Sequence, residues 1–147
     1  MAFLFDTDAI SELLRPRPAM AYLKWLMKVA REEQFTSAVV IGELYKGAYR
    51  SQDRNRHLSN IEQRVLPAVT VLPYDTDTAK VFGKIRAYLE EAGTILPDAD
   101  LQIAATAVCY NLELVTAVSY THLRAHETAL RISYAVFCLK RGGGGGG

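Results

Sequence analysis

The chain has few cysteines and no long apolar segment. Its 147 residues include two cysteines, Cys109 and Cys138, and no Cys-x-x-Cys pair, so neither a disulfide scaffold nor a cysteine-rich zinc site is expected. Its apolar runs are far shorter than the roughly 18–20 residues that a membrane helix needs. No basic stretch precedes the first apolar residues. We therefore expect no signal peptide, no membrane contact and a cytoplasmic location.

An excess of charge of one sign is also missing. The sequence has 17 Lys and Arg against 16 Asp and Glu, a formal net charge of +1. Residues 118–147 hold four of the basic groups and one of the acidic groups, which leaves 13 basic and 15 acidic groups among residues 1–117. This balance excludes a protein that coats nucleic acid with a broadly basic surface, so any RNA contact must come from a local patch.

Short apolar runs alternate with segments of helical spacing. Half of the residues are hydrophobic, and the length predicts one domain. The alternation predicts an α/β fold with a central parallel sheet flanked by helices. Strands are expected at residues 3–5, 35–39, 69–72 and 112–116, and helices at 9–14, 19–33, 58–66, 76–92 and 97–111, with another through Ile41, Leu44, Tyr45 and Ala48. Thr7 or Asp8 is the expected cap of the first helix.

The end of the sequence differs from the rest. No capped, periodic segment continues after Ala117, and the chain closes with six glycines, which cannot support a packed core. Residues 118–147 look like translated sequencing-adapter read-through, so we take residues 1–117 as the domain and 118–147 as a non-native, irregular tail. His122 and His126 have the i, i+4 spacing of zinc ligands, but no glutamate lies between them as in zinc proteases, so two solvent-exposed histidines are expected instead.

Acidic residues interrupt or border three apolar segments. Asp6 follows residues 3–5, Glu43 lies in the apolar segment 39–44, and Asp100 precedes the apolar segment 101–105. Because the carboxyl ends of parallel strands share one edge of a sheet, these side chains are expected to lie close together. Neighbouring carboxylates stay ionised when a cation lies among them, and oxygen ligands suit Mg²⁺ or Mn²⁺. The pattern predicts a metal site that could hydrolyse phosphodiesters.

Each acid also has a structural explanation. Asp6 could cap the first helix, and Glu43 and Asp100 could be first-turn acids favoured by the helix dipole. A second catalytic reading uses Asp6 and Asp8, whose spacing matches the nucleophile and general acid of haloacid-dehalogenase-type phosphatases. That reading requires Thr or Val where Ile10 stands, and it leaves Glu43 without a role.

Three segments resemble the motif regions of PIN-domain ribonucleases, most closely the VapC toxins of bacterial toxin–antitoxin pairs. The segments are residues 5–11, residues 37–45 with Gly42-Glu43-Leu44, and residues 100–107. The resemblance covers roughly residues 2–117 and implies a three-layer fold. It also implies an endoribonuclease that depends on Mg²⁺ or Mn²⁺ and cleaves tRNA or another structured RNA.

The same resemblance implies roles for individual residues. It makes Asp6, Glu43 and Asp100 the catalytic metal ligands, with Thr7, Asp8 and Asp98 as possible auxiliary residues. The family usually has Asn where Asp8 stands. Beyond Ala117 the family continues with an Asn- or Asp-bearing segment and a final strand, whereas Val118 begins the tail here. We therefore expect the C-terminal strand to be missing and the activity of this chain to be impaired.

The resemblance implies three partners: an RNA substrate, a cognate antitoxin and a second copy in a homodimer. The stripe of Tyr22, Leu23, Leu26 and Met27, with Trp25 nearby, is either an antitoxin surface or ordinary core. The basic residues Lys46, Arg50, Arg54 and Arg56 either guide RNA phosphates or form a solvated face. An inactive chain that binds antitoxin without catalysis is the alternative function.

Overall fold

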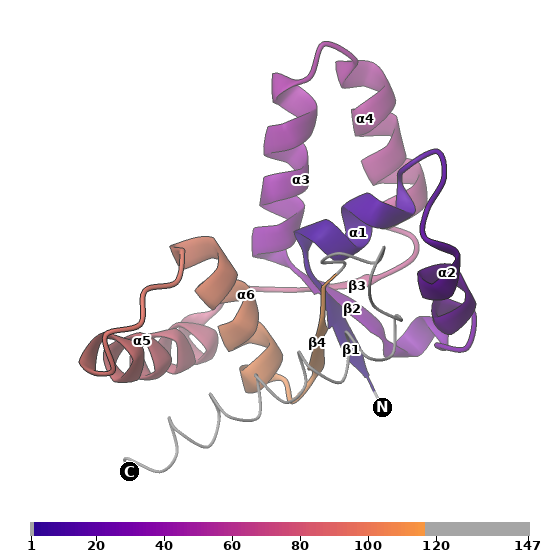
Figure 1. The fold of residues 1–147 in the computed structure, drawn as a ribbon. Helices are drawn as coiled ribbons and strands as arrows, with labels where there is room; N and C mark the ends of the chain where they lie inside the picture. The colour runs from indigo at the N-terminus through magenta and orange to yellow at the C-terminus, as the bar shows by residue number, and fades with distance from the viewer. Residues whose placement is uncertain (1, 117–147) are drawn as a thin grey trace.

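A single parallel sheet forms the centre of the molecule. The computed structural model describes residues 2–116 (Figure 1). The strands are β1 (Phe3–Phe5), β2 (Gln34–Ser37), β3 (Thr70–Leu72) and β4 (Glu113–Val115). Their order is β3-β2-β1-β4, and every neighbouring pair is parallel. The predicted strands and the predicted α/β class are confirmed, while the tail and the missing final strand lie outside the described residues.

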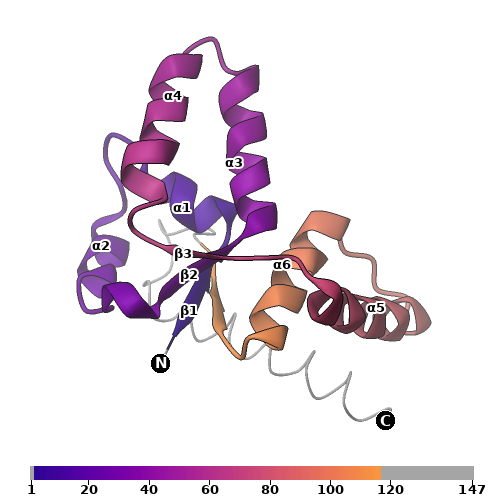
Figure 2. The ribbon, with the colours of Figure 1, turned by 180° about the vertical axis from the view of Figure 1, so that it is seen from behind.

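Helices cover the sheet on both sides. They are α1 (Thr7–Leu13), α2 (Met20–Leu26), α3 (Ala38–Arg50), α4 (Arg54–Asn60), α5 (Thr76–Glu91) and α6 (Asp98–Cys109), with a 3-10 turn η1 (Arg31–Glu33) and a π-helical turn η2 (Ile61–Val65). Figures 1 and 2 show α5 and α6 on one side of the sheet, α2 on the other, and the α3–α4 hairpin standing off the carboxyl ends of the strands. This arrangement is the expected three-layer fold.

The chain order places a crevice beside the middle of the sheet. From β1 the chain steps outward to β2 and β3, then crosses back to form β4 on the other side of β1. The connection after β1 therefore leads to a strand on one side of β1, and the connection after β3 leads to a strand on its other side. Parallel sheets form ligand sites where the strand order reverses in this way. Leu4 and Val115, from these two strands, are fully buried, so the sheet beneath this crevice is a packed support.

The second helix is shorter than the apolar spacing predicts. A helix was expected over 19–33, but α2 ends at Leu26. The amides of Lys28 and Val29 turn back to the carbonyls of Trp25 and Leu26, and the Gln34 side chain donates to the Val29 carbonyl. These bonds close the helix early and lead the chain into β2.

The aromatic residues of α2 also differ from expectation. Trp25 was expected off the apolar stripe, yet its ring packs against Phe3, Phe5 and Tyr22, with centroids 5.0, 6.1 and 6.1 Å away. Met27, a stripe residue, is 86% exposed. The buried face is therefore set by contact with β1 rather than by spacing along the helix alone.

The helix expected at 58–66 begins earlier than predicted. Its first part, α4, begins at Arg54, and the amide of His57 donates to the carbonyl of Asp53. Arg54 and Arg56 therefore lie on a helix that packs against α3. No helix within residues 2–116 is both long and apolar enough to cross a membrane.

Candidate active site

Asp6 links β1, β4 and α1 at the carboxyl edge of the sheet. Its amide donates to the Val115 carbonyl at 3.0 Å, which fastens it to β4. Its Oδ1 accepts from the Ala9 amide at 2.8 Å and caps α1. Asp6, rather than Thr7 or Asp8, is thus the helix cap, because α1 begins at Thr7, two residues before the predicted start at residue 9. One oxygen of this carboxylate therefore serves the fold by capping α1.

The surroundings of Asp6 work against its negative charge. Removal from water raises the pKa of Asp6 to about 6, and the nearby charges of Asp8 and Asp100 act in the same direction. Hydrogen bonds from the Thr116 side chain and the Ala9 amide oppose this rise. The ionised form of Asp6 is therefore unfavourable at the sheet edge, and a nearby positive charge would stabilise it.

Glu43 is brought to the same edge by the helix that follows β2. The fully buried Ser37 ends β2, and its Oγ accepts from the Val40 amide at 3.1 Å, which fixes the start of α3. Since α3 begins at Ala38, Glu43 lies in the second turn and not the first, as had been expected. The Thr7 hydroxyl donates a short hydrogen bond to the Glu43 carboxylate. Thr7 thus joins the start of α1 to α3 and orients Glu43.

Asp100 reaches the same group of charges from α6. It lies in the first turn of that helix, as predicted. Burial raises the pKa of Asp100, and the charges of Glu43 and Asp8 raise it further. Asp6, Asp8, Glu43 and Asp100 therefore interact electrostatically although they come from three distant parts of the sequence. The structure brings the three predicted ligands into one neighbourhood.

The donor chemistry of this neighbourhood fits a divalent cation. Hard carboxylate oxygens that repel one another are the ligands that Mg²⁺ and Mn²⁺ prefer. Within residues 2–116, however, no three His, Cys, Asp or Glu side chains are already gathered closely enough to form a metal centre. Binding of a cation would therefore require these carboxylates to move toward one another.

Asp98 and Asp8 occupy different surroundings. The Asp98 carboxylate forms an ion pair with Arg86 of α5 and is 79% exposed. The charges that act on Asp6 and Asp100 include Asp8 but not Asp98. Asp8 is exposed, yet it contributes to the negative field of the site. An auxiliary role for Asp98 remains a prediction, with its side chain directed to α5 in this structure.

Thr116 is a site residue that sequence reasoning did not identify. It directly follows β4, is 6% exposed and hydrogen-bonds to the Asp6 carboxylate. A signal was present, because a polar residue that follows the strand beside β1 must reach the same sheet edge as Asp6.

A cleft continues from Thr7 and Glu43 between α1, α3 and α4. Its volume is about 500 Å³. Of the four basic residues predicted to contact RNA, Arg56 lines this cleft, whereas Arg54 contacts the carbonyl and ring of Tyr49. Arg15 and His57 also line it and were not predicted. The residues Lys46 and Arg50 are exposed on α3.

The sequence of the chain matches a known domain family. Residues 3–117 match the PIN domain. The chain is 35% identical over 118 residues to Toxin FitB of Neisseria gonorrhoeae, an alignment that covers 77% of this chain and 85% of that protein. It is 34% identical to VapC ribonuclease Y4jK of Sinorhizobium fredii, with 77% and 84% covered.

Solved structures give the same result. The crystal structure of FitAcB from Neisseria gonorrhoeae superposes with a TM-score of 0.74 at 29% identity, covering 90% of this chain and 93% of that one. VapBC-5 from Mycobacterium tuberculosis, a member of the VapBC family of toxin-antitoxin systems, superposes with a TM-score of 0.57 at 27% identity, covering 78% and 83%. The chain therefore belongs to the PIN-domain family and is related within it to the VapC and FitB toxins.

Proposed function

We propose that this chain is a divalent-metal-dependent endoribonuclease, the toxin of a toxin–antitoxin pair, acting on tRNA or another structured RNA. The observation that carries the proposal is that Asp100 lies close enough to Asp6 and to Glu43 for its charge to interact with both, at one edge of a PIN-domain sheet. A named relative is a VapC ribonuclease. Carboxylates that hold a divalent cation suit hydrolysis by an activated water.

Each residue of the site has a role in this proposal. Asp6, Glu43 and Asp100 would hold Mg²⁺ or Mn²⁺, which when bound neutralises charge on a phosphate oxygen and lowers the pKa of a bound water. Thr7 orients Glu43 through its hydroxyl, and Thr116 holds Asp6 through its side chain. These hydrogen bonds limit the orientations of Glu43 and Asp6, so the two carboxylates have a shorter way to move when they bind a shared ion.

Metal-titrated cleavage of total RNA tests the catalytic part of the proposal. The full 147-residue chain is incubated with RNA while Mg²⁺ or Mn²⁺ is varied, and the cut sites are mapped. We expect Asp6→Asn and Asp100→Asn to abolish cleavage that EDTA also abolishes. Asp77→Asn is the matched control, because Asp77 is likewise an acid in a first helical turn, that of α5. Equal cleavage by all four proteins would remove the metal-ligand assignment.

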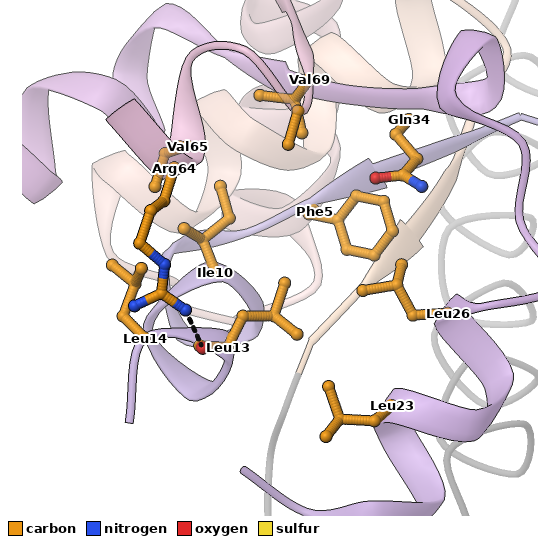
Figure 3. A pocket seen from close by; sticks show the side chains of 11 residues that line it. Phe5, Ile10, Leu13, Leu14, Leu23, Leu26, Gln34, Arg64, Val65 and Val69 are labelled. Atoms are coloured by element: carbon orange, nitrogen blue, oxygen red, sulfur yellow. Dashed lines mark hydrogen bonds between the residues drawn. The ribbon is translucent and has the colours of Figure 1, made fainter. Parts of the chain in front are cut away.

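An apolar cavity offers a place for the antitoxin. About 250 Å³ in volume, it lies between α1, α2 and η2, and Leu23 and Leu26 of the predicted stripe line it (Figure 3). Tyr22 and Trp25 belong to the core instead, since Tyr22 is fully buried and donates to the Ala9 carbonyl. The stripe is therefore partly core and partly accessible, and we propose that an apolar side chain of the antitoxin enters this cavity.

Charged substitutions on α2 test the antitoxin surface. Met20 and Met27 are 64% and 86% exposed, so Met20→Lys with Met27→Lys leaves the core intact. We expect this double variant to lose co-purification with the antitoxin encoded beside the gene. Ile95→Lys, at a residue 89% exposed before α6, is the control and should retain it. Light scattering of the same samples measures whether the chain forms the predicted homodimer.

The phosphatase reading has less support. It gives no role to Glu43, which here is oriented by Thr7 and interacts with Asp100. Trapping of a phosphate on Asp6 would revive it. The inactive-toxin alternative predicts a chain that binds the antitoxin but cleaves no RNA at any metal concentration.

A further inference from the structure

The cleft between α1, α3 and α4 is continuous with the acidic site. Thr7 and Glu43, which belong to that site, form part of its wall. From there it extends along α3 past Gly47 to Arg56, His57 and Asn60, with Arg15 contributed by the loop after α1. One end of the cleft is thus acidic and the other is rich in groups that donate hydrogen bonds.

Arg15 is held in place by a buried partner. Its Nη1 donates to Glu12 at 3.1 Å, and the Glu12 side chain is only 10% exposed. The other Glu12 oxygen accepts from the Ala19 amide at 3.3 Å. Because Glu12 is fixed by α1 and by the start of α2, it fixes the direction of Arg15. Arg15 itself is 69% exposed, so a ligand can reach it.

Arg56 approaches from the opposite wall. Its Nε pairs with Asp53 at 2.6 Å, and its side chain is 61% exposed. A guanidinium carries five N–H donors, so one carboxylate leaves donors that can bind a phosphate. The two arginines present positive charge on both sides of a cleft whose far end is negative. A strand of alternating phosphates and bases fits this pattern, because its next phosphate would meet the arginines while the first lies at the acids.

Gly47 keeps the floor of the cleft open. It lies inside α3, where glycine is less favourable than alanine. A Cβ built on Gly47 meets no atom within 4 Å, so packing does not explain the glycine. Gly42 and Gly83 have equally open surroundings, but neither lines the cleft. Close approach of a ligand to the helix backbone is an established reason for glycine at such a position.

We infer that this cleft is an RNA subsite, which holds the nucleotide next to the phosphate at the acidic site and binds its flanking phosphate through Arg15 and Arg56. This inference rests on the proposed ribonuclease function. The volume is within the range of pockets that enclose a small ligand, and it suits a single extended nucleotide rather than a base-paired helix. His57 and Asn60 are placed to contact the base or sugar.

Filling the cleft tests the inference without disturbing the fold. Gly47→Leu places a side chain in the cleft, and Gly83→Leu places the same side chain on α5. We expect both variants to melt at or above the wild-type temperature. Gly47→Leu should raise KM for a synthetic single-stranded oligoribonucleotide that spans a mapped cut site by about tenfold or more, the effect of losing a phosphate contact and its stacking space. Gly83→Leu should leave KM unchanged, and an unchanged KM in Gly47→Leu would overturn the inference.

Charge substitutions identify the groups that bind the phosphate. Arg15→Ala and Arg56→Ala should each weaken binding of the same oligoribonucleotide and reduce the salt dependence of binding, each by about one phosphate contact. Arg56→Lys should restore part of the affinity, and Lys24→Ala, which removes an exposed charge on α2, should change neither quantity. Unaltered salt dependence in both alanine variants would exclude a phosphate contact.

Failure of this inference can be separated from failure of the proposed function. If the wild-type chain cuts RNA and the cleft variants cut it with wild-type KM, the ribonuclease proposal stands and the subsite is wrong. If the wild-type chain cuts no RNA, the proposed function fails. Binding of the oligoribonucleotide to wild type and Gly47→Leu, measured by fluorescence anisotropy, then decides the subsite alone.

Discussion

Asp6 serves the fold and the site with the same carboxylate. It caps α1 through Oδ1, and burial, together with the nearby charges of Asp8 and Asp100, raises its pKa to about 6. The two roles can be separated by substitution, because asparagine caps a helix as well as aspartate but carries no charge. Residue-scale experiments on Asp6 therefore distinguish a structural aspartate from a ligand.

Asp6→Asn is expected to stabilise the metal-free chain while it abolishes cleavage. The cap remains, and the unfavourable charge is removed, so we expect a gain in the free energy of unfolding of about 1–3 kcal/mol near pH 8. Urea denaturation in EDTA measures it. A loss of stability would mean that the hydrogen bond to the capping oxygen contributes more to the free energy of unfolding than the unfavourable charge does.

The gain from Asp6→Asn should depend on pH in a defined direction. The folded protein holds the Asp6 proton up to a pKa of about 6, whereas the ordinary value is 3.8. The ionised form thus destabilises the fold, fully above pH 7 and not at all below pH 4. We expect the stability difference between Asp6→Asn and wild type to be near zero at pH 4 and to rise through pH 6. A difference that is constant from pH 4 to pH 8 would contradict the raised pKa.

Thr116→Val tests the residue that the sequence did not reveal. Valine keeps the shape of the buried side chain but cannot donate to Asp6. Since that hydrogen bond lowers the pKa of Asp6, its loss should raise the pKa further and shift the acidic limb of the cleavage profile to higher pH. A profile of cleavage rate against pH measures the shift, and Thr106→Val, at another buried threonine, is the control.

At the scale of elements, the start of α3 decides where Glu43 lies. Ser37 ends β2 and caps α3, and β2 is fixed to β1 by its register and by the hydrogen bond from the Thr36 hydroxyl to the Phe5 carbonyl. The position of Glu43 is therefore tied to the strand that carries Asp6. A change in this cap should act on catalysis through the helix, without touching the carboxylates.

Ser37→Ala should lower both stability and cleavage. Loss of a buried cap costs about 1 kcal/mol, and a frayed first turn moves Glu43 away from Asp100. Urea denaturation and RNA cleavage measure the two effects. Ser51→Ala, which removes an exposed hydroxyl after α3, should stay within about 0.5 kcal/mol of wild type. Unaltered cleavage in a destabilised Ser37→Ala would show that the cap does not position Glu43.

The elements also show what sequence patterns can predict. Strands and long helices followed from apolar spacing. Ser37 and Asp75 cap α3 and α5, and Gly93 and Asn111, both with positive φ, follow the ends of α5 and α6. The predicted start of α1 and end of α2 were wrong. Asp6 is fixed by β4, which is distant in sequence, and the turns that end α2 at Lys28 and Val29 are held by the Gln34 side chain of β2. Local periodicity contains no information about those partners.

The candidate site was predictable to a similar extent. Apolar flanks identified Asp6, Glu43 and Asp100, and strand order brings them together. The cleft was not predictable. Arg15, Gly47 and Arg56 form no recognisable sequence pattern, and they line one cleft only because α1, α3 and α4 pack together. Thr116 required knowledge that β4 pairs with β1.

At the scale of the whole molecule, the order of the strands brings the carboxylates of Asp6, Glu43 and Asp100 to one edge of the sheet, where their negative charges repel one another. Addition of Mg²⁺ should therefore stabilise the whole domain. At a concentration one hundred times the dissociation constant, the gain is about 2.7 kcal/mol. Thermal melts with Mg²⁺ and with EDTA measure it. The gain should be larger at pH 8 than at pH 5, where protons compete for Asp6, and absent in Asp6→Asn.

The α3–α4 hairpin stands off the carboxyl ends of the strands (Figure 1). Glu43 lies in the second turn of α3, Arg56 lies in α4, and both line the cleft. Because the two helices pack as one unit, a shift of the hairpin relative to the sheet would change the width of the cleft and the position of the Glu43 carboxylate together.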